Sequence, residues 1–163
     1  MKSLSRILAP ILLLTLLFPA LALSETMGAL VKTDGLYYKK FSDVPFTGKV
    51  TGNEQGSFKD GKEDGPWVYS QDNGQLVSKG TYKDGKRDGP WVTYWDNRQL
   101  RAKGTYKDEK RDGPWVTYWF NGQLRTKGTY KDGKKDGPWV RYWDNGTVWS
   151  ALTGTYKNGV RVK

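Results

Sequence analysis

The sequence predicts an all-β protein, an elongated single antiparallel meander sheet of stacked β-hairpin repeats, each 24 residues long. Three observations lead to this prediction. A motif recurs at a fixed period, two turn signals fall within each period, and the runs between turns alternate polar residues with aromatic and β-branched ones. A fixed period of this length indicates stacked units, and alternating runs bounded by turns indicate strands.

The tetrapeptide Gly-Pro-Trp-Val defines the repeat. It begins at Gly65, Gly89, Gly113 and Gly137, so each step is 24 residues. The predicted units are 58–81, 82–105, 106–129, 130–155 and a truncated unit 156–163. The unit 130–155 is longer because Ala151 and Leu152 form an insertion of two residues.

The N-terminal part departs from the repeat. Lys2 and Arg6 precede a short apolar run, and small residues follow it up to Ser24. This order is typical of a secretory signal peptide, here residues 1–24, with cleavage near Ala22 or Ser24. We therefore expect a periplasmic or secreted protein, with a retained N-terminal anchor as the alternative. Residues 25–57 are predicted to form a degenerate β unit that caps the repeats.

Each unit carries two turn signals. One is Asn-Gly, which suits the type I′ turn of a two-residue hairpin, with Asn97-Arg98 as a deviation; the other is Asp-Gly, predicted to be the looser turn, with Asp108-Glu109 as a deviation. A left-handed conformation at Arg98 or Glu109 costs about 1 kcal/mol.

The Asn-Gly turn sets a predicted register. It places Trp95 opposite Leu100, Trp91 opposite Gly104 and Gly89 opposite Tyr106 on one face. We interpret this face as the packed face because a ring can cover a position without a side chain. The row Trp67, Trp91, Trp115 and Trp139 is then core rather than a carbohydrate site.

The other face is predicted to be the binding surface. The same register pairs Tyr94 with Arg101 and Val92 with Lys103, and in the next unit Tyr118 with Arg125 and Val116 with Lys127. It also pairs Tyr142 with Trp149, so that Tyr rings alternate with basic side chains. Aromatic and basic groups together can hold rings and anions. The alternative is that they are ordinary cross-strand pairs. The predicted partner-binding residues are Tyr94, Arg101, Lys103, Tyr118, Arg125, Lys127, Tyr142 and Trp149.

Catalysis is not expected. The chain has no Cys and no His, which excludes thiol and His-based nucleophilic sites as well as Cys/His zinc sites. The Asp residues near the turns suit turn capping better than a metal. Nearly every polar residue recurs with the repeat, whereas a catalytic set requires convergent, distinct groups. We expect no catalytic residue, no metal and no cofactor.

The recurring pattern Tyr-Lys-Asp-Gly-Lys, Asp-Gly-Pro-Trp-Val, Asn-Gly-Gln-Leu and Lys-Gly-Thr-Tyr resembles the MORN-repeat variant family, including bacterial proteins described as YwqK-type antitoxins. The resemblance extends from about Asp34 to the C-terminus. It implies stacked β-hairpins in one twisted sheet and a binding role, in scaffolding, membrane association or toxin neutralisation.

These observations favour a non-catalytic, exported protein-interaction module, antitoxin-like or immunity-like, with an unknown protein partner. The alternative is a binder of an anionic membrane surface or an acidic polysaccharide, which the formal net charge of +10 favours. No specific nucleic acid and no small-molecule cofactor is expected as a partner.

Overall fold

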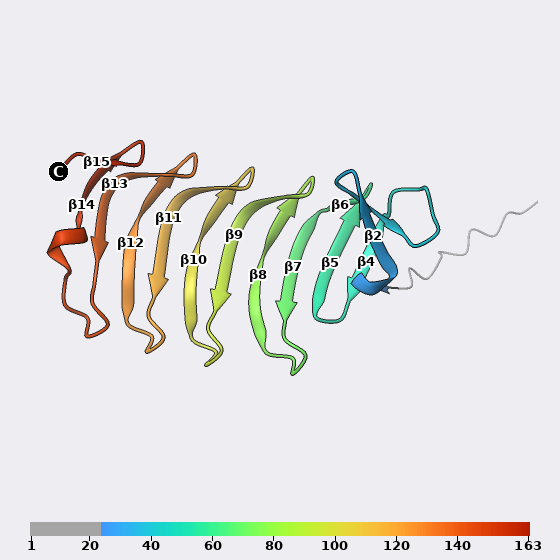
Figure 1. Cartoon of the computed structure of the whole chain (residues 1–163), viewed down its shortest axis with the longest axis horizontal. Coiled ribbons are helices and arrows are strands. Elements are labelled where there is room, and N and C mark those ends of the chain that lie inside the picture. Colours follow the sequence, from blue (N-terminus) through green and yellow to red (C-terminus); the bar gives the residue numbers. More distant parts are fainter. Residues whose placement is uncertain (1–23) are drawn as a thin grey trace, which may run out of the picture.

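The computed structural model describes residues 24–163, so the predicted signal peptide lies outside the described residues apart from Ser24. The described chain forms one long sheet and one short sheet (Figure 1). The strands of the long sheet are β1 (Glu25–Thr26), β4 (Gly48–Thr51), β5 (Glu54–Lys59), β6 (Lys62–Glu63), β7 (Gly65–Ser70), β8 (Leu76–Lys83), β9 (Lys86–Tyr94), β10 (Leu100–Lys107), β11 (Lys110–Tyr118), β12 (Leu124–Lys131), β13 (Lys134–Arg141), β14 (Gly154–Lys157) and β15 (Val160–Arg161). The short sheet pairs β2 (Leu30–Thr33) with β3 (Leu36–Lys39).

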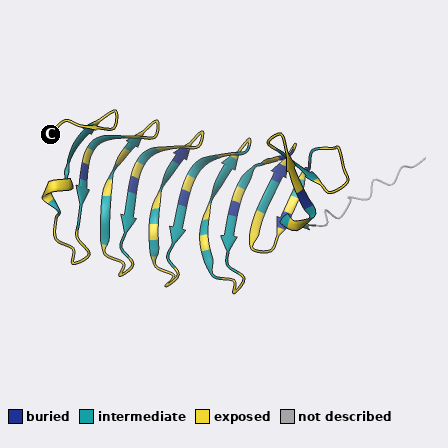
Figure 2. Cartoon of the chain, viewed as in Figure 1, coloured by how far each residue is buried: buried dark blue, intermediate teal, exposed yellow. Residues whose placement is uncertain are grey.

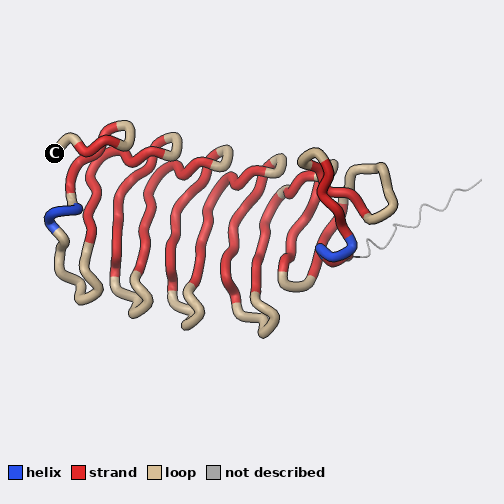
Figure 3. The backbone as a smooth tube through the Cα atoms, in the orientation of Figure 1, coloured by secondary structure: helices blue, strands red, loops and turns tan. Residues whose placement is uncertain are grey.

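The order of strands in space follows the order in sequence. From β7 to β15 each strand pairs antiparallel with the next one along the chain, β6 pairs at the side of β5, and β1 runs parallel to β4. The repeats therefore form a single-layered, elongated meander (Figure 3). The predicted fold class is confirmed.

The two turn types exchange the roles expected from the sequence. In the Asp-Gly turns both central residues have positive φ, as at Asp84 (51°) and Gly85 (79°), and Lys83 pairs directly with Lys86. This is the geometry of a two-residue hairpin loop of the I′ kind. The Asn-Gly signals instead form longer loops, so the prediction of a two-residue turn there is wrong.

The loop around Asn97 explains the difference. The N–H of Arg98 donates to the carbonyl of Trp95, and the N–H of Trp95 donates to the carbonyl of Gln99. Only the third loop residue, Arg98, has a positive φ, 68°. A three-residue loop of this kind adds one residue and a bulge to the hairpin. The Asn97 Oδ1 accepts the N–H of Gln99, which fixes the loop from inside.

The bulge changes the register near the loop. Trp91 lies opposite Gly104 and Gly89 opposite Tyr106, as predicted, but Leu100 lies opposite Tyr94 rather than Trp95. The predicted pairs of Tyr94 with Arg101, Tyr118 with Arg125 and Tyr142 with Trp149 are therefore wrong; the observed partners are Leu100, Leu124 and Val148. The pairs of Val92 with Lys103 and Val116 with Lys127 are confirmed.

A second irregularity bends each long strand at the glycine of the Gly-Pro-Trp-Val motif. Gly89 has a φ of 108° and Gly113 a φ of 92°, values that residues with a side chain rarely adopt. The register of β10 with β11 shifts close to this point, between Gly104 and Tyr106. Along the chain, the Asp-Gly turn comes before the bend, and the tryptophan of the motif comes after it.

The core is a ladder of rings along one face of the sheet. Each buried tryptophan leans over a glycine of the preceding strand: a Cβ added at Gly80 or Gly104 would overlap the ring of Trp91 or Trp115. Between successive tryptophans lie tyrosines in edge-to-face contact, with ring centroids 5.4 Å apart for Tyr82 and Trp91. Such pairs are favourable beyond the area they bury. The buried positions form one narrow line across the repeats (Figure 2).

The N-terminal residues close one end of this ladder. Leu30 from β2 and Phe46 from the segment before β4 pack with Phe58 and Trp67 in a separate buried cluster. At the other end, the inserted Ala151 and Leu152 lie in a short 3-10 helix, η2 (Ser150–Leu152), so that β14 begins only at Gly154.

Candidate binding face

Cations cover the ring ladder on the side of the Asp-Gly turns. The Arg111 guanidinium lies 4.4 Å from the ring centroid of Trp115 and 5.2 Å from that of Tyr130. Lys135 Nζ lies 4.6 Å from the centroids of both Trp139 and Tyr156. Arg87 occupies the same place one unit earlier. Each cation stands opposite the tyrosine of its hairpin, so the register of the Asp-Gly hairpin builds this row.

A second row of cations follows the Asn-Gly loops. The guanidinium of Arg101 lies 4.9 Å from the ring of Trp95, and that of Arg125 lies 4.4 Å from the ring of Trp119. Each indole Nε1 donates to a carbonyl of the next unit, Trp95 to Tyr118 and Trp119 to Tyr142, which holds the rings in place. Cation–π contacts of this kind are attractive at about 0.5–1 kcal/mol at exposed sites.

Both rows belong to the same face as the buried tryptophans. Arg87, Arg101 and Arg111 line one shallow hollow together with Trp91 and Trp115. We call this surface the arginine–tryptophan face. Its basic residues are Arg87, Arg101, Arg111, Arg125, Lys135 and Arg141.

The predicted binding residues are divided between the two faces. The loop bulge places Arg101 and Arg125 on the arginine–tryptophan face, not beside Tyr94 and Tyr118 as predicted. Trp149 occupies the position equivalent to Arg125. Its ring stacks on that of Trp143, with the two ring centroids 3.7 Å apart.

The remaining predicted residues lie on the opposite face, the proline–valine face. It carries the Pro and Val of each motif, and Lys103 and Lys127 lie opposite Val92 and Val116 as predicted. Lys127 Nζ is 6.0 Å from the ring of Tyr142. The members on this face from the predicted set are Tyr94, Lys103, Tyr118, Lys127 and Tyr142.

Few carboxylates oppose the cations of the arginine–tryptophan face. Within residues 24–163, Arg87 is the one basic residue of this face that forms an ion pair, with Glu109 at 2.7 Å. Arg101, Arg111, Arg125, Lys135 and Arg141 form none in the described chain. An unneutralised row of cations over apolar rings attracts anions.

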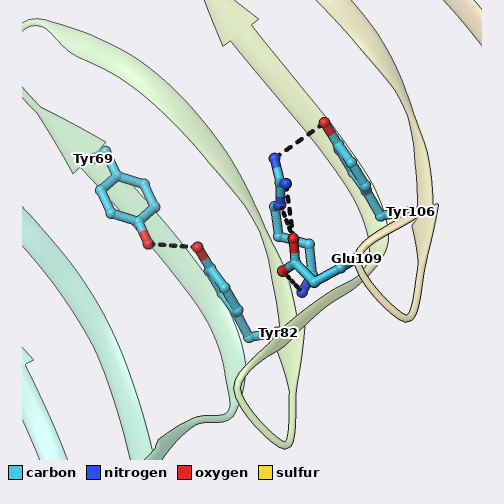
Figure 4. A network of polar contacts seen from close by, with 5 residues as sticks. Tyr69, Tyr82, Tyr106 and Glu109 are labelled. Carbon is cyan, nitrogen blue, oxygen red and sulfur yellow. Dashed lines mark hydrogen bonds and ion pairs between the residues drawn. The ribbon is translucent and has the colours of Figure 1, made fainter. Parts of the chain in front are cut away.

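Glu109 and Arg87 form the polar network in Figure 4. The hydrogen bond with Glu109 raises the pKa of Arg87. Burial raises the pKa of the Glu109 carboxyl, but the hydrogen bonds from Arg87 outweigh this and leave the pKa lowered. In the same region the hydroxyls of Tyr69 and Tyr82 lie 3.0 Å apart, and burial raises the pKa of both. These groups stay in their ordinary charge states near neutral pH.

Sequence reasoning missed Arg87, Arg111 and Lys135. A signal for them was available, because the Asp-Gly turn read as a two-residue hairpin places Arg87 opposite Tyr82 and Arg111 opposite Tyr106. The Asn-Gly turn alone does not indicate these pairs, because it forms the bulged loop.

No group of three or more acidic side chains in the described part of the chain is arranged to hold a metal ion. No helix within residues 24–163 is long and apolar enough to span a membrane.

The repeats match a known family model. The model described as MORN repeat variant matches residues 63–84, 87–108, 111–132 and 135–158, more than half of the chain. Each match begins at Glu63, Arg87, Arg111 or Lys135 and ends at the first residue of the next tight turn, which is Asp84, Asp108, Asp132 or Asn158. No individual curated protein sequence matches the chain.

Proposed function

Because the chain belongs to the MORN repeat variant family, whose repeats are commonly binding modules, we propose that it is a non-catalytic, exported module that binds an anionic partner through the arginine–tryptophan face. An acidic polysaccharide, an anionic membrane surface and an acidic protein are partners of this chemistry. The export part of the proposal rests on Lys2, Arg6 and the apolar run that follows them.

The observation that carries the proposal is the set of unpaired cations. Arg101, Arg111 and Arg125 stand over indole rings without a carboxylate partner in the described chain. Stacking holds each guanidinium plane in place, so less side-chain freedom is lost when an anion binds. The repeat brings such groups into line about every 9.5 Å, the width of two strands.

The non-catalytic part follows from the repetition of the polar residues. The polar side chains of the face recur from unit to unit, and a catalytic centre requires distinct groups converging on one point. Turnover of any substrate in a broad hydrolase panel would overturn it.

A second candidate is a protein partner, such as a toxin neutralised in an antitoxin-like or immunity-like role, bound on the proline–valine face. One observation favours it: Pro90 is exposed and Val92 and Tyr94 are only half-buried on a sheet that has a single layer. An apolar stripe of this kind suits a protein surface.

Two double variants separate these candidates. Arg101→Glu with Arg125→Glu reverses charge on the arginine–tryptophan face, and Lys103→Glu with Lys127→Glu makes the same change of net charge on the opposite face. We expect purified chain to bind polygalacturonate and anionic vesicles at low salt, and to lose this binding at high salt.

The first variant should abolish that binding and the second should leave most of it. Equal losses in both would show that net charge alone attracts the anions. Binding of a protein partner that survives high salt and fails only with the second variant would favour the second candidate.

A further inference from the structure

One residue breaks the Asp-Gly turn pattern on the arginine–tryptophan face. Glu109 stands where other units have Gly85 and Gly133, and it keeps the left-handed backbone of those glycines, with a φ of 67°. That conformation is unfavourable for a residue with a side chain. The side chain of Glu109 makes contacts that offset the cost of this backbone conformation.

The carboxylate of Glu109 is bound by three donors of a single residue. The Arg87 Nε and Nη2 donate to Oε2 at 2.9 and 2.7 Å, and the backbone N–H of Arg87 donates to Oε1. The third guanidinium nitrogen, Nη1, donates to the hydroxyl of Tyr106, whose ring lies 4.2 Å away (Figure 4). Arg87 and Tyr106 thus form a fixed carboxylate site, occupied by the chain itself.

The next unit repeats this site without the carboxylate. Arg111 Nη1 donates to the hydroxyl of Tyr130 at 3.0 Å, as Arg87 does to Tyr106. The N–H of Gly133 donates to the carbonyl of Arg111 at 2.9 Å, as the N–H of Glu109 does to that of Arg87. Gly133 has no side chain, and neither the backbone N–H nor the other guanidinium nitrogens of Arg111 bond to a carboxylate in residues 24–163.

The unit after that offers an ammonium in the same place. Lys135 lies between Trp139 and Tyr156, and Gly159 donates to its carbonyl at 2.8 Å. The row ends there, because the Arg161 guanidinium donates to the carbonyls of Ala151 and Thr153.

Resting on the proposed function, we propose that Arg111 and Lys135 are carboxylate sites for an acidic polypeptide segment of a partner, which lies across the strands and places its side chains as Glu109 does on Arg87. Two guanidinium N–H groups on one carboxylate oxygen and a backbone N–H on the other hold a planar carboxylate in one orientation. The occupant of the first site is itself a glutamate side chain, which favours a polypeptide over a polysaccharide.

The spacing of the sites also favours a polypeptide. Equivalent positions are two strands apart, about 9.5 Å. One turn of a polyproline II helix takes three residues and about 9.3 Å. Acidic segments with few apolar residues stay unfolded, and unfolded chains often adopt this conformation. A Glu at every third position would place one carboxylate on each site.

The test measures binding of the purified full chain to a peptide that repeats Glu-Pro-Pro, with the Gln-Pro-Pro peptide as its neutral match, by calorimetry at low salt. Arg111→Gln should weaken binding by about tenfold or more, the loss expected for one charge-assisted contact. Glu109→Gly should strengthen it by a similar factor, because it frees Arg87 as a third site and restores the common turn residue.

Two control variants carry the same changes of charge outside the row. Lys107→Gln matches Arg111→Gln on the opposite face, and Asp108→Asn matches Glu109→Gly next to it. The gain expected for Glu109→Gly keeps the test decisive even where Arg111→Gln weakens the fold.

Each outcome bears on the proposal. Equal effects of Glu109→Gly and Asp108→Asn would overturn the carboxylate sites, as would tight binding of the Gln-Pro-Pro peptide. Binding of polygalacturonate with the expected response to Glu109→Gly, but no binding of the peptide, would overturn the polypeptide partner. Anionic probes that bind through Arg101 and Arg125 regardless of Arg111 would overturn this inference and leave the proposed function. No binding of any anionic probe would overturn both.

Discussion

At the scale of single residues, the alternation of the strand separates core from surface. Trp115 is 4% exposed and lies between Tyr106 and Tyr130, whereas Tyr118, three residues later, is half-buried on the opposite face. Removal of a buried Trp side chain leaves a cavity that a single-layered sheet has no second layer to fill.

We therefore expect Trp115→Ala to lower the free energy of unfolding by about 3–5 kcal/mol. Tyr118→Ala should lower it by about 1 kcal/mol or less, the value of a cross-strand contact. Chemical denaturation of both variants measures the difference. Small and equal losses would show that the tryptophan ladder is not the core.

The residues that could be predicted are those whose neighbours lie far from the loops. Trp91 opposite Gly104 follows from counting along the strands, and burial of the tryptophans follows from their glycine partners. Arg101 could not be placed in this way, because the one extra residue of the Asn loop turns its side chain to the other face. In a structure with a period of two, an error of one residue reverses the face.

At the scale of the hairpin, the two turns of each unit connect the strands in different ways. The Asp-Gly turn is the tight two-residue connection, and the Asn loop is longer and braced by the Asn side chain. The Asn97 Nδ2 also donates to the carbonyl of Phe120 at 2.6 Å, which links one loop to the next. The presence of two turns per unit was predictable, but their types were not, because Asn-Gly and Asp-Gly both tolerate positive φ.

Arg98 tests this account of the loop. It holds the left-handed position that Gly74, Gly122 and Gly146 fill in the other loops, and its side chain makes no hydrogen bond within residues 24–163. Arg98→Gly should therefore raise the free energy of unfolding by up to about 1 kcal/mol. Thermal and chemical unfolding measure the gain.

Asn97→Ala is the matched change in the same loop. It removes the bonds to Gln99 and Phe120, so we expect a loss of about 1 kcal/mol or more. Destabilisation by Arg98→Gly would mean that packing of the Arg98 side chain outweighs the backbone strain.

At the scale of the whole molecule, stability is a sum over neighbouring units. The ring ladder from Phe58 to Trp139 passes within a repeat unit or between neighbouring units, and the N-terminal cluster closes one end of it. The elongated meander was predictable from the 24-residue period. The closure of the N-terminal end by β2 and β3 was less predictable. The degenerate sequence of residues 25–57 does not indicate that these two strands form a separate short sheet.

Because each unit contacts only its neighbours, one whole unit can be removed if the following side chains keep their faces of the sheet. Deletion of residues 106–129 joins Thr105 to Tyr130 and restores the sequence of an uninterrupted repeat. We expect a folded protein with a lower free energy of unfolding. That free energy should also depend less steeply on denaturant concentration, since less surface is exposed on unfolding.

Deletion of residues 106–128 is the control. It removes one residue fewer and joins Thr105 to Thr129, so every following side chain changes face. Circular dichroism and denaturation should find the first variant folded and the second unfolded or aggregated. Two variants of equal stability would mean that the units fold independently of a shared register.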